Sequence, residues 1–257
     1  MDGIKISAVI ITLNEEKNIQ ACIDSVKDVV DEIVVVDSFS TDQTEEICRN
    51  NGVRFLQHQW EGHGKQKNWG NKQAAYDYIL SLDADERLSD GLKEAILAIR
   101  EKWQYDVYSV NRLTYFHGRK IKYGFYPDRQ LRLFDRRKAQ WNMTFHDRII
   151  VNKGAKLKRI HQDIIHFANK DIHELVDTLN HNSTLFAHDR IDLGKPSFFK
   201  LIFSPTFEFI KTYFFKLGFL EGIFGFIICM NMAHYRFLKY AKRMEHYKVN
   251  RQNRKVL

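Results

Sequence analysis

The sequence predicts an α/β fold, a mixed and mostly parallel sheet flanked by helices, followed by an amphipathic helical extension at the carboxyl end. Three observations support this class. Short β-branched runs alternate with helix-like segments over about the first hundred residues. Residues 106–167 then alternate inward and outward side chains, as antiparallel strands do. Residues 197–237 contain 11 of the 19 phenylalanines.

The composition of the 257 residues is that of an ordinary globular protein, with 44% apolar and 28% charged residues. Cys22, Cys48 and Cys229 are far apart and belong to no C-x-x-C motif, so neither a disulfide framework nor a zinc site is indicated. We therefore expect a reducing, cytoplasmic location. The first 12 residues carry an acid, Asp2, and only a short apolar run, which is typical of a strand rather than a signal peptide.

The net charge of +8 is unevenly distributed along the chain. Residues 1–100 hold 11 Lys and Arg against 18 Asp and Glu, a balance of −7. Residues 101–257 hold 29 against 14, a balance of +15. A uniformly basic surface would suggest nucleic acid binding, whereas an acidic part joined to a basic part suggests two tasks on one chain.

Four strands are expected in the first part of the chain. The β-branched run from Ile4 to Leu13 is typical of a strand buried on both faces of a parallel sheet. The other three are Glu32–Asp37, Val53–Gln57 and Tyr78–Leu82. Because helices are expected between them, this order predicts parallel pairing through right-handed crossovers.

Caps and apolar spacing predict the helices between these strands. The first should begin at residues 14–16, and the second should run from a cap at residues 40–42 to Arg49. A third is expected over about residues 65–75, and a fourth from a cap at Ser89 to roughly Lys102. The inner face of the first helix would consist of Ile19, Cys22, Ile23 and Val26.

Polar residues follow three of the expected strands directly. They are Asn14 and Glu15, then Asp37, and then Asp83 and Asp85. In open α/β sheets, ligands bind at the carboxyl ends of the strands. Each residue alone could equally be a helix cap or a turn residue, but their arrival at one edge of one sheet favours a ligand site.

Asp83 and Asp85 flank Ala84 just past a buried strand, where both carboxylates can reach one hard cation. Mg²⁺ and Mn²⁺ prefer oxygen ligands and often share them with substrate phosphates. This D-x-D pattern therefore predicts a metal-held diphosphate, whose departure the metal would assist. The chain contains no P-loop and no G-x-G-x-x-G, and the segment Gly62–Lys65 lacks the required spacing.

The second part of the chain changes in style. The strands of residues 106–167 would complete the sheet. A helix is expected from Asp171 to about Arg190, and the segment 194–196 (Gly-Lys-Pro) marks a break. The expected domains are a main domain over residues 1–193, made of halves of about 1–103 and about 104–193, and an extension over residues 194–257.

The extension has the composition of a membrane-surface segment. Its apolar run from Gly222 to Ala233 is too short to span a bilayer, which needs about 20 residues. Eight Lys and Arg against one acid follow between Arg236 and Lys255. Aromatic amphipathic helices followed by a basic tail suit an anionic leaflet, but a helical subdomain packed on the core remains an alternative. No helix-turn-helix, RRM or zinc signature supports nucleic acid binding.

Three stretches together resemble the family 2 glycosyltransferases with a GT-A fold. They are AVIITLNEEKNI (8–19), EIVVVDSFSTDQT (32–44) and YILSLDADERLS (78–89). Four further stretches are similar to the lipopolysaccharide-core β-glucosyltransferase branch, so the resemblance covers most of the chain. These are GHGKQKNWG (62–70), YPDRQLRLF (126–134), FHDRI (145–149) and PTFEFIKTYFFKLGFLEGIFGF (205–226).

The resemblance implies a glycosyltransferase domain over residues 1–193, with a nucleotide-sugar half of about 1–103 and an acceptor half of about 104–193. It also implies roles for particular residues. The loop Thr12, Leu13, Asn14 and Glu15 should line the nucleotide pocket, and Asp37 should bind the base, usually uracil. Gln66, Lys67 and Asn68 match a segment near the donor. Asp83 and Asp85 are the D-x-D pair, with Asp85 the direct ligand of Mg²⁺ or Mn²⁺. Asp147 corresponds to the catalytic base, although relatives more often carry Glu after that His.

The implied chemistry is an inverting transfer. Asp147 would deprotonate an acceptor hydroxyl as its oxygen attacks the anomeric carbon. Arg129 and Arg132 could contact phosphate or acceptor, or could simply belong to an exposed strand face. His146 and His166 could add a metal ligand or be hydrogen-bonded structural histidines.

The resemblance favours UDP-glucose as donor and a lipid-linked saccharide such as the lipopolysaccharide inner core as acceptor. The enzyme would then act as a peripheral protein on the cytoplasmic face of the inner membrane, against an anionic surface. A polyprenyl-phosphate sugar synthase is the rival enzyme. It is disfavoured because its acceptor is a phosphate, which needs no catalytic base to deprotonate it. A catalytically inactive membrane-surface binding module of the same fold is the alternative outside the enzymes.

Overall fold

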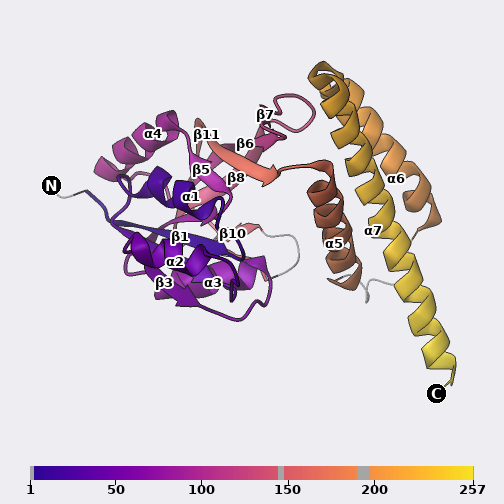
Figure 1. The fold of residues 1–257 in the computed structure, drawn as a ribbon, viewed down its shortest axis with the longest axis horizontal. Helices are drawn as coiled ribbons and strands as arrows, with labels where there is room; N and C mark the ends of the chain where they lie inside the picture. Colours follow the sequence, from indigo (N-terminus) through magenta and orange to yellow (C-terminus); the bar gives the residue numbers. More distant parts are fainter. Residues whose placement is uncertain (1–2, 144–147, 190–196, 257) are drawn as a thin grey trace. The chain divides into compact units, whose positions relative to one another are not determined.

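A computed structural model describes residues 3–143, 148–189 and 197–256. The chain divides into two compact units (Figure 1). The first comprises Met1–Leu113 and Pro127–Phe167, and the second comprises Thr114–Tyr126 and Ala168–Leu257. The break expected at residues 194–196, and with it the expected boundary between residues 193 and 194, lies outside the described residues.

The parallel part of the sheet forms as the sequence predicts. The strands β3, β2, β1 and β4 lie side by side in that order and are all parallel. Every residue of β1 is buried, because the strand lies at the middle of this part and is covered on both faces. The bounds are β1 Ile6–Thr12, β2 Glu32–Asp37, β3 Arg54–Gln57 and β4 Tyr78–Asp83.

The antiparallel strands extend the same sheet beyond β4, in the order β8, β6, β11 and β5. A short strand, β7, pairs with the end of β6, and β9 and β10 form a separate two-stranded ribbon. Their bounds are β5 Glu86–Leu88, β6 Val107–Phe116, β7 Arg119–Lys120, β8 Asp128–Asp135, β9 Ala139–Trp141, β10 Ile149–Val151 and β11 Leu157–Asn169. The expected mixed, mostly parallel sheet is confirmed.

Four helices belong to the first unit: α1 Ile19–Val26, α2 Thr44–Asn50, α3 His63–Gln73 and α4 Asp90–Glu101. The Ser89 cap of α4 is confirmed, since its hydroxyl accepts a bond from Leu92 N at 3.3 Å. The expected start of α1 at residues 14–16 is wrong. Asn14 instead adopts a left-handed backbone (φ 54°) that a helix cannot contain, so α1 begins only at Ile19.

Both faces of the sheet carry a core, because alternate residues of each central strand point to opposite sides. Ala8 and Ile10 join one cluster with α1 and α4, whereas Val9 and Ile11 join the other. On the second face α3 lies very close to the strands. A Cβ on Gly70 would come within 2.7 Å of the side chains of both Val9 and Val36, so only glycine permits this approach.

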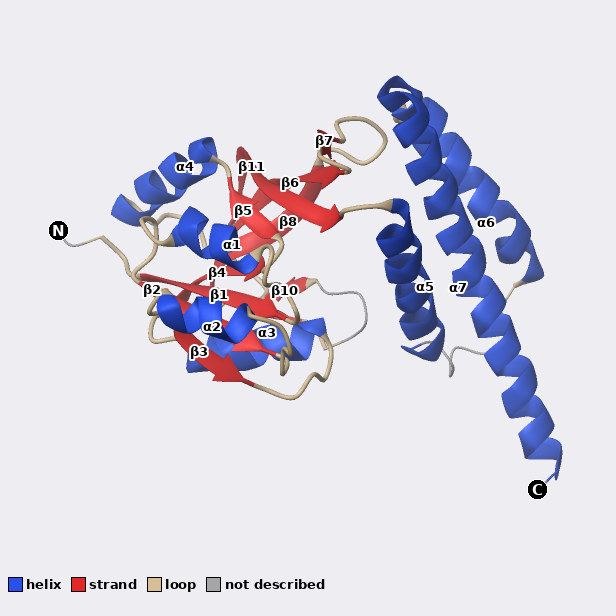
Figure 2. Ribbon diagram, in the orientation of Figure 1, coloured by secondary structure: helices blue, strands red, loops and turns tan. Residues whose placement is uncertain are grey.

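Helices make up most of the second unit (Figure 2). They are α5 Ile172–Asp189, α6 Phe198–Ile210, a π-helical segment η1 Lys211–Phe215, a 3₁₀ turn η2 Gly218–Glu221, and the 35-residue α7 Gly222–Val256. The helix expected from Asp171 is thus confirmed as α5. This unit has a small core of its own, formed by Phe116, Ile121, Leu175 and Ile228.

We tested whether the described helices could cross a membrane. No single one of them combines the necessary length and apolarity. One bent pair, Phe198–Phe215 with Gly218–Val249, meets both criteria when taken together across a 72° bend.

Candidate active site

Three neighbouring parallel strands end in polar residues at one edge of the sheet. Thr12 at the end of β1 is paired in register with Asp37 at the end of β2, and Asp83 at the end of β4 is paired with Ile11. Thr12 and Asp37 are only 4% and 0% exposed. Thr12 Oγ1 has no hydrogen-bond partner among the described residues. The fold thus concentrates polar groups where open α/β sheets bind ligands.

The loop after β1 is fastened to the loop after β2. Asn14 N donates to Ser40 Oγ at 2.8 Å, and Thr41 N donates to Asn14 Oδ1 at 2.8 Å. Asp37 accepts bonds from both the backbone N–H (2.9 Å) and the hydroxyl of Ser40. The orientation of the Asp37 carboxylate is therefore fixed by its own loop before any ligand arrives.

The other residues of the first loop differ in exposure. Leu13 is 49% exposed at the carboxyl end of β1. Glu15 accepts a bond from Asn18 Nδ2 at 2.8 Å, and its backbone N–H donates to Thr44 Oγ1 at 2.9 Å. Leu13 therefore offers an apolar surface beside the polar strand ends, while Glu15 helps to hold the two loops together.

The segment 66–68 of α3 makes three separate sets of contacts. Gln66 is buried, donates to Ser38 Oγ at 3.0 Å and contacts His58 Nδ1 at 2.8 Å. Asn68 makes a two-way bond with the backbone of Trp141, donating to its oxygen at 2.8 Å and accepting from its nitrogen at 3.0 Å. Both amides therefore fasten α3 to neighbouring loops and strands.

Lys67, between them, points toward the D-x-D pair. Its side chain is only 3% exposed, and its Nζ lies 2.8 Å from Asp83 Oδ1 and 4.3 Å from the ring centroid of Trp141. Arg132 contacts the other Asp83 oxygen, Oδ2, at 3.1 Å. Burial raises the pKa of Asp83, but the charges of Lys67 and Arg132 lower it by more, so the pKa lies well below its usual range. Asp83 is therefore ionised, and both of its oxygens face basic groups.

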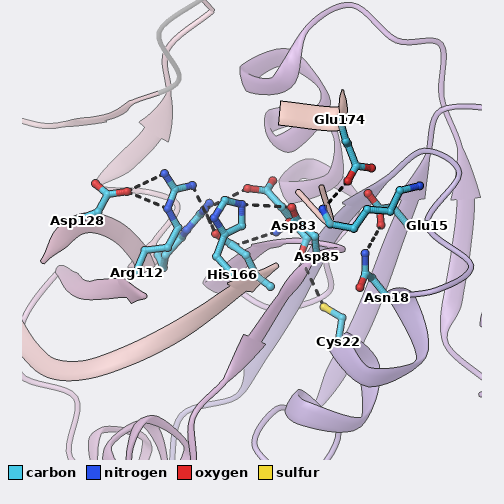
Figure 3. A network of polar contacts seen from close by, with 12 residues as sticks. Glu15, Asn18, Cys22, Asp83, Asp85, Arg112, Asp128, His166 and Glu174 are labelled. Atoms are coloured by element: carbon cyan, nitrogen blue, oxygen red, sulfur yellow. Dashed lines mark hydrogen bonds and ion pairs between the residues drawn. The ribbon is translucent and has the colours of Figure 1, made fainter. Parts of the chain in front are cut away.

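Asp85 has a different environment (Figure 3). Its Oδ2 lies 3.2 Å from Nε2 of His166 on β11, and its backbone oxygen accepts a bond from Phe167 N at 3.0 Å. Its other carboxylate oxygen, Oδ1, is buried and has no hydrogen-bond partner among the described residues. A buried carboxylate oxygen without a partner is costly unless a ligand satisfies it.

These residues fit a divalent cation. The described residues contain no group of three or more His, Cys, Asp or Glu able to hold a metal ion by themselves. Mg²⁺, however, is commonly held by one or two protein ligands, with substrate phosphates and water completing the shell. Asp85, with one oxygen unpartnered and His166 beside it, matches such a partial set better than Asp83, which already faces two basic groups.

A buried ion pair beside the D-x-D motif was not predicted from the sequence. Glu86 is 0% exposed, its Oε1 pairs with Arg132 Nη2, and its Oε2 accepts a bond from Asp83 N at 3.1 Å. Nε and Nη1 of Arg132 are buried and have no hydrogen-bond partner among the described residues. The sequence contained one signal for the burial of Glu86. Side chains alternate between the two sides of the chain along residues 84–88, so Ala84, Glu86 and Leu88 all point inward.

The remaining candidates are placed as follows. Ala84 is 3% exposed, and its side chain belongs to the apolar core cluster that also contains Leu88. Arg129 is exposed on β8, in register with Asn111 of β6. His146 and Asp147, the expected catalytic base, lie outside the described residues.

The three cysteines are expected to be unreactive in the folded protein. All three are buried and unpaired, and burial, with Glu86 and Asp85 nearby, raises the pKa of the Cys22 thiol. Burial likewise raises the pKa of Cys229, and raises that of Cys48 from 9.0 to about 12, which lowers its thiolate fraction about 1,000-fold at pH 8.

We expect a disulfide reagent at pH 8 to modify all three thiols promptly in guanidinium and none of them promptly in buffer. Rapid modification of a thiol in the folded chain would contradict the buried positions.

The fold and the sequence were compared with known proteins. The mannosyltransferase PcManGT of Pyrobaculum calidifontis, solved in complex with GDP-Man and Mn²⁺, superposes with a TM-score of 0.57 at 15% identity, covering 93% of this chain and 87% of that one. This likeness confirms the expected GT-A-type fold. The sequence profile described as glycosyl transferase family 2 matches residues 7–160.

Relatives similar over nearly the whole chain agree with this match. An uncharacterized glycosyltransferase of Rickettsia typhi is 33% identical over 94% of this chain and 87% of its own length. The lipopolysaccharide core biosynthesis glycosyltransferase LpsC of Rhizobium meliloti is 34% identical over 92% of this chain and 91% of its own length. The chain therefore belongs to glycosyl transferase family 2 and is a glycosyltransferase, and the expected similarity to the lipopolysaccharide-core branch is confirmed.

Proposed function

We propose that the chain transfers glucose from UDP-glucose, with inversion, to a hydroxyl of a lipid-linked saccharide such as the lipopolysaccharide inner core. The observation that carries the donor site is the buried Oδ1 of Asp85, which has no hydrogen-bond partner in the described part of the chain and lies at the sheet edge where β1, β2 and β4 end. The similarity to LpsC supports the acceptor class.

In this proposal, different residues at the carboxyl edge of the sheet bind different parts of the donor. Asp37, oriented by Ser40, binds the base, and Thr12, Leu13, Asn14 and Glu15 form the loop around the nucleoside. Asp85 and His166 hold Mg²⁺ or Mn²⁺, which when bound neutralises charge on the departing diphosphate.

The buried cations and the base complete the site. Lys67 and Arg132 keep Asp83 ionised and fixed. Nε and Nη1 of Arg132, for which the described residues provide no hydrogen-bond partner, are donors that a diphosphate oxygen could use. Arg129 offers a further cation for a phosphate or the acceptor. Asp147 takes the proton from the attacking acceptor hydroxyl, and a single displacement turns an α-linked donor into a β-linked product.

We place this reaction at the cytoplasmic face of the inner membrane, with the enzyme bound peripherally to an anionic surface. A lipid-linked saccharide is held at a membrane, so the enzyme must reach the surface to use it. The basic balance of residues 101–257 supports this location.

The test is a transfer assay with purified chain, Mn²⁺ and inner-core lipopolysaccharide. UDP-glucose, UDP-galactose and GDP-mannose are offered separately, and the anomeric configuration of the product is read by NMR. We expect transfer from a UDP-sugar with a β-linkage, and Asp147→Asn should abolish transfer while leaving UDP binding intact. Transfer to polyprenyl phosphate alone would favour the rival synthase, and UDP binding without any transfer would favour the inactive module.

A further inference from the structure

Helix α6 exposes most of its large apolar side chains and buries its carboxylate, Glu208. Phe199, Phe203 and Phe207 are 72%, 62% and 64% exposed. Glu208, by contrast, is only 9% exposed, and its carboxylate pairs with Arg236 of α7 at 3.0 Å. A helix on a water-facing surface has the opposite arrangement. The outer side of α6 is therefore built for an apolar environment.

Exposed apolar side chains continue along the chain through the turn and onto α7. Phe215 in the turn is 80% exposed, and Ile223 at the start of α7 is 67% exposed. Phe226 of α7 joins the two helices, with its ring centroid 5.9 Å from that of Phe209 and 5.8 Å from that of Tyr213. We call this surface the phenylalanine face; its exposed members are Phe198, Phe199, Ile202, Phe203, Phe207, Ile210, Phe214, Phe215, Leu217, Phe219, Leu220, Ile223, Phe226 and Met230.

The backbone of the turn is tightly specified. Leu217 adopts a left-handed conformation (φ 59°), which is costly for a branched side chain. A Cβ on Gly218 would lie 2.7 Å from the oxygen of Thr212, and one on Gly225 would overlap the oxygen of Gly218. The turn therefore packs in one way, with its phenylalanines directed outward, and is not a loosely ordered loop that happens to be apolar.

Lysines lie among these phenylalanines and favour a bilayer over a second protein. Lys200 and Lys216 are exposed within the same segment, and Lys248 is exposed toward the end of α7. Protein interfaces are depleted of lysine, whereas membrane surfaces combine aromatic side chains with lysines that reach anionic headgroups. Part of the basic run on α7 serves the fold, because Arg236 pairs with Glu208 and Lys242 binds Asn180 Oδ1 at 2.6 Å.

The dimensions suit one leaflet. Helix α6 and the segment η1 that continues it, Phe198–Phe215, span at most about 27 Å at the usual helical rise, less than the roughly 30 Å of a hydrocarbon core, and the chain then bends by 72°. We infer that the phenylalanine face inserts into the headgroup and acyl boundary of one leaflet of an anionic phospholipid bilayer, with Lys200 and Lys216 contacting the headgroups. This inference rests on the proposed function for its acceptor, but binding to lipid can be measured without any turnover.

The experiment is flotation of the full chain with vesicles of phosphatidylcholine containing 25% phosphatidylglycerol, and with phosphatidylcholine alone. The test variant replaces three of the most exposed members of the face, Phe199→Gln, Phe207→Gln and Phe215→Gln. A matched variant replaces three exposed apolar residues of the first unit, Leu97→Gln, Ile150→Gln and Leu157→Gln, which are 41%, 52% and 54% exposed. UDP titration and sedimentation velocity are run on all three proteins.

We expect the wild type and the matched variant to float with the anionic vesicles and to bind neutral vesicles at least tenfold more weakly. The phenylalanine variant should bind anionic vesicles at least 100-fold more weakly while binding UDP as the wild type does. Equal flotation of the two variants would overturn the inference. So would a wild-type dimer that the phenylalanine variant converts to a monomer, because the face would then be a subunit interface. Loss of UDP binding in every protein, with flotation as expected, would contradict the donor site and leave the membrane face standing.

Discussion

Replacing Asp85 with asparagine is expected to lower kcat/KM for sugar transfer by about 10³-fold or more, the size of effect seen when a group that stabilises transition-state charge is removed. Asparagine keeps the shape of the side chain and a carbonyl oxygen toward His166, but it removes the negative charge. The unpartnered Oδ1, for which we propose a cation, loses its charge with it. The measurement is kcat/KM at saturating and at limiting Mn²⁺.

A nearby aspartate provides the control for this variant. Asp128 pairs with Arg112 Nη2 at 2.7 Å in the same polar network, but we place it in neither the metal site nor the nucleotide site. Asp128→Asn should change kcat/KM less than tenfold. If Asp85→Asn retained activity like that of Asp128→Asn, with the same dependence on Mn²⁺, the role given to Asp85 would be wrong.

Glu86→Gln is expected to lower the free energy of unfolding by about 3–5 kcal/mol, the usual cost of removing one partner of a buried ion pair. Glu86 and Arg132 are 0% and 2% exposed, so the guanidinium would remain in the interior with Asp83 as its only carboxylate contact given by the structure. The change is measured by urea unfolding at constant pH and salt concentration.

The control is the same substitution at an exposed pair. Glu45 pairs with Arg49 one turn along α2 at 2.7 Å, and these side chains are 37% and 64% exposed. Glu45→Gln should cost no more than about 0.5 kcal/mol. Equal losses for the two variants would show that Glu86 and Arg132 are not a buried pair in solution.

The strand-end carboxylates could be predicted because the information is local. A β-branched run followed by a carboxylate indicates both the strand and its polar end, and β2 ends at Asp37 as the sequence predicted. The residue at which α1 begins could not be predicted in the same way. Asparagine is a residue type that often caps helices, but the hydrogen-bond partners of Asn14 are Ser40 and Thr41 on another loop.

The buried charges required the structure, because their partners are distant in sequence. Arg132 reaches Asp83 and Glu86 from β8, which pairs with β4 only after the chain has returned through β6. The resemblance places Gln66 and Asn68 near the donor, and the structure adds their bonds to His58 and Trp141. Similarly, the composition of α6 predicted an amphipathic helix, but the burial of Glu208 shows which side faces outward.

The central claim is that the carboxyl edge of the sheet binds a nucleotide through a cation held at Asp85. Calorimetric titration of UDP, with and without Mn²⁺, into the wild type and Asp85→Asn tests it most directly, with GDP and CMP as comparison ligands. We expect UDP to bind the wild type at least tenfold more tightly with Mn²⁺ than without, and we expect the metal to have no effect on UDP binding by the variant. Wild-type binding of UDP that ignores the metal, or no preference for UDP over the other two nucleotides, would contradict it.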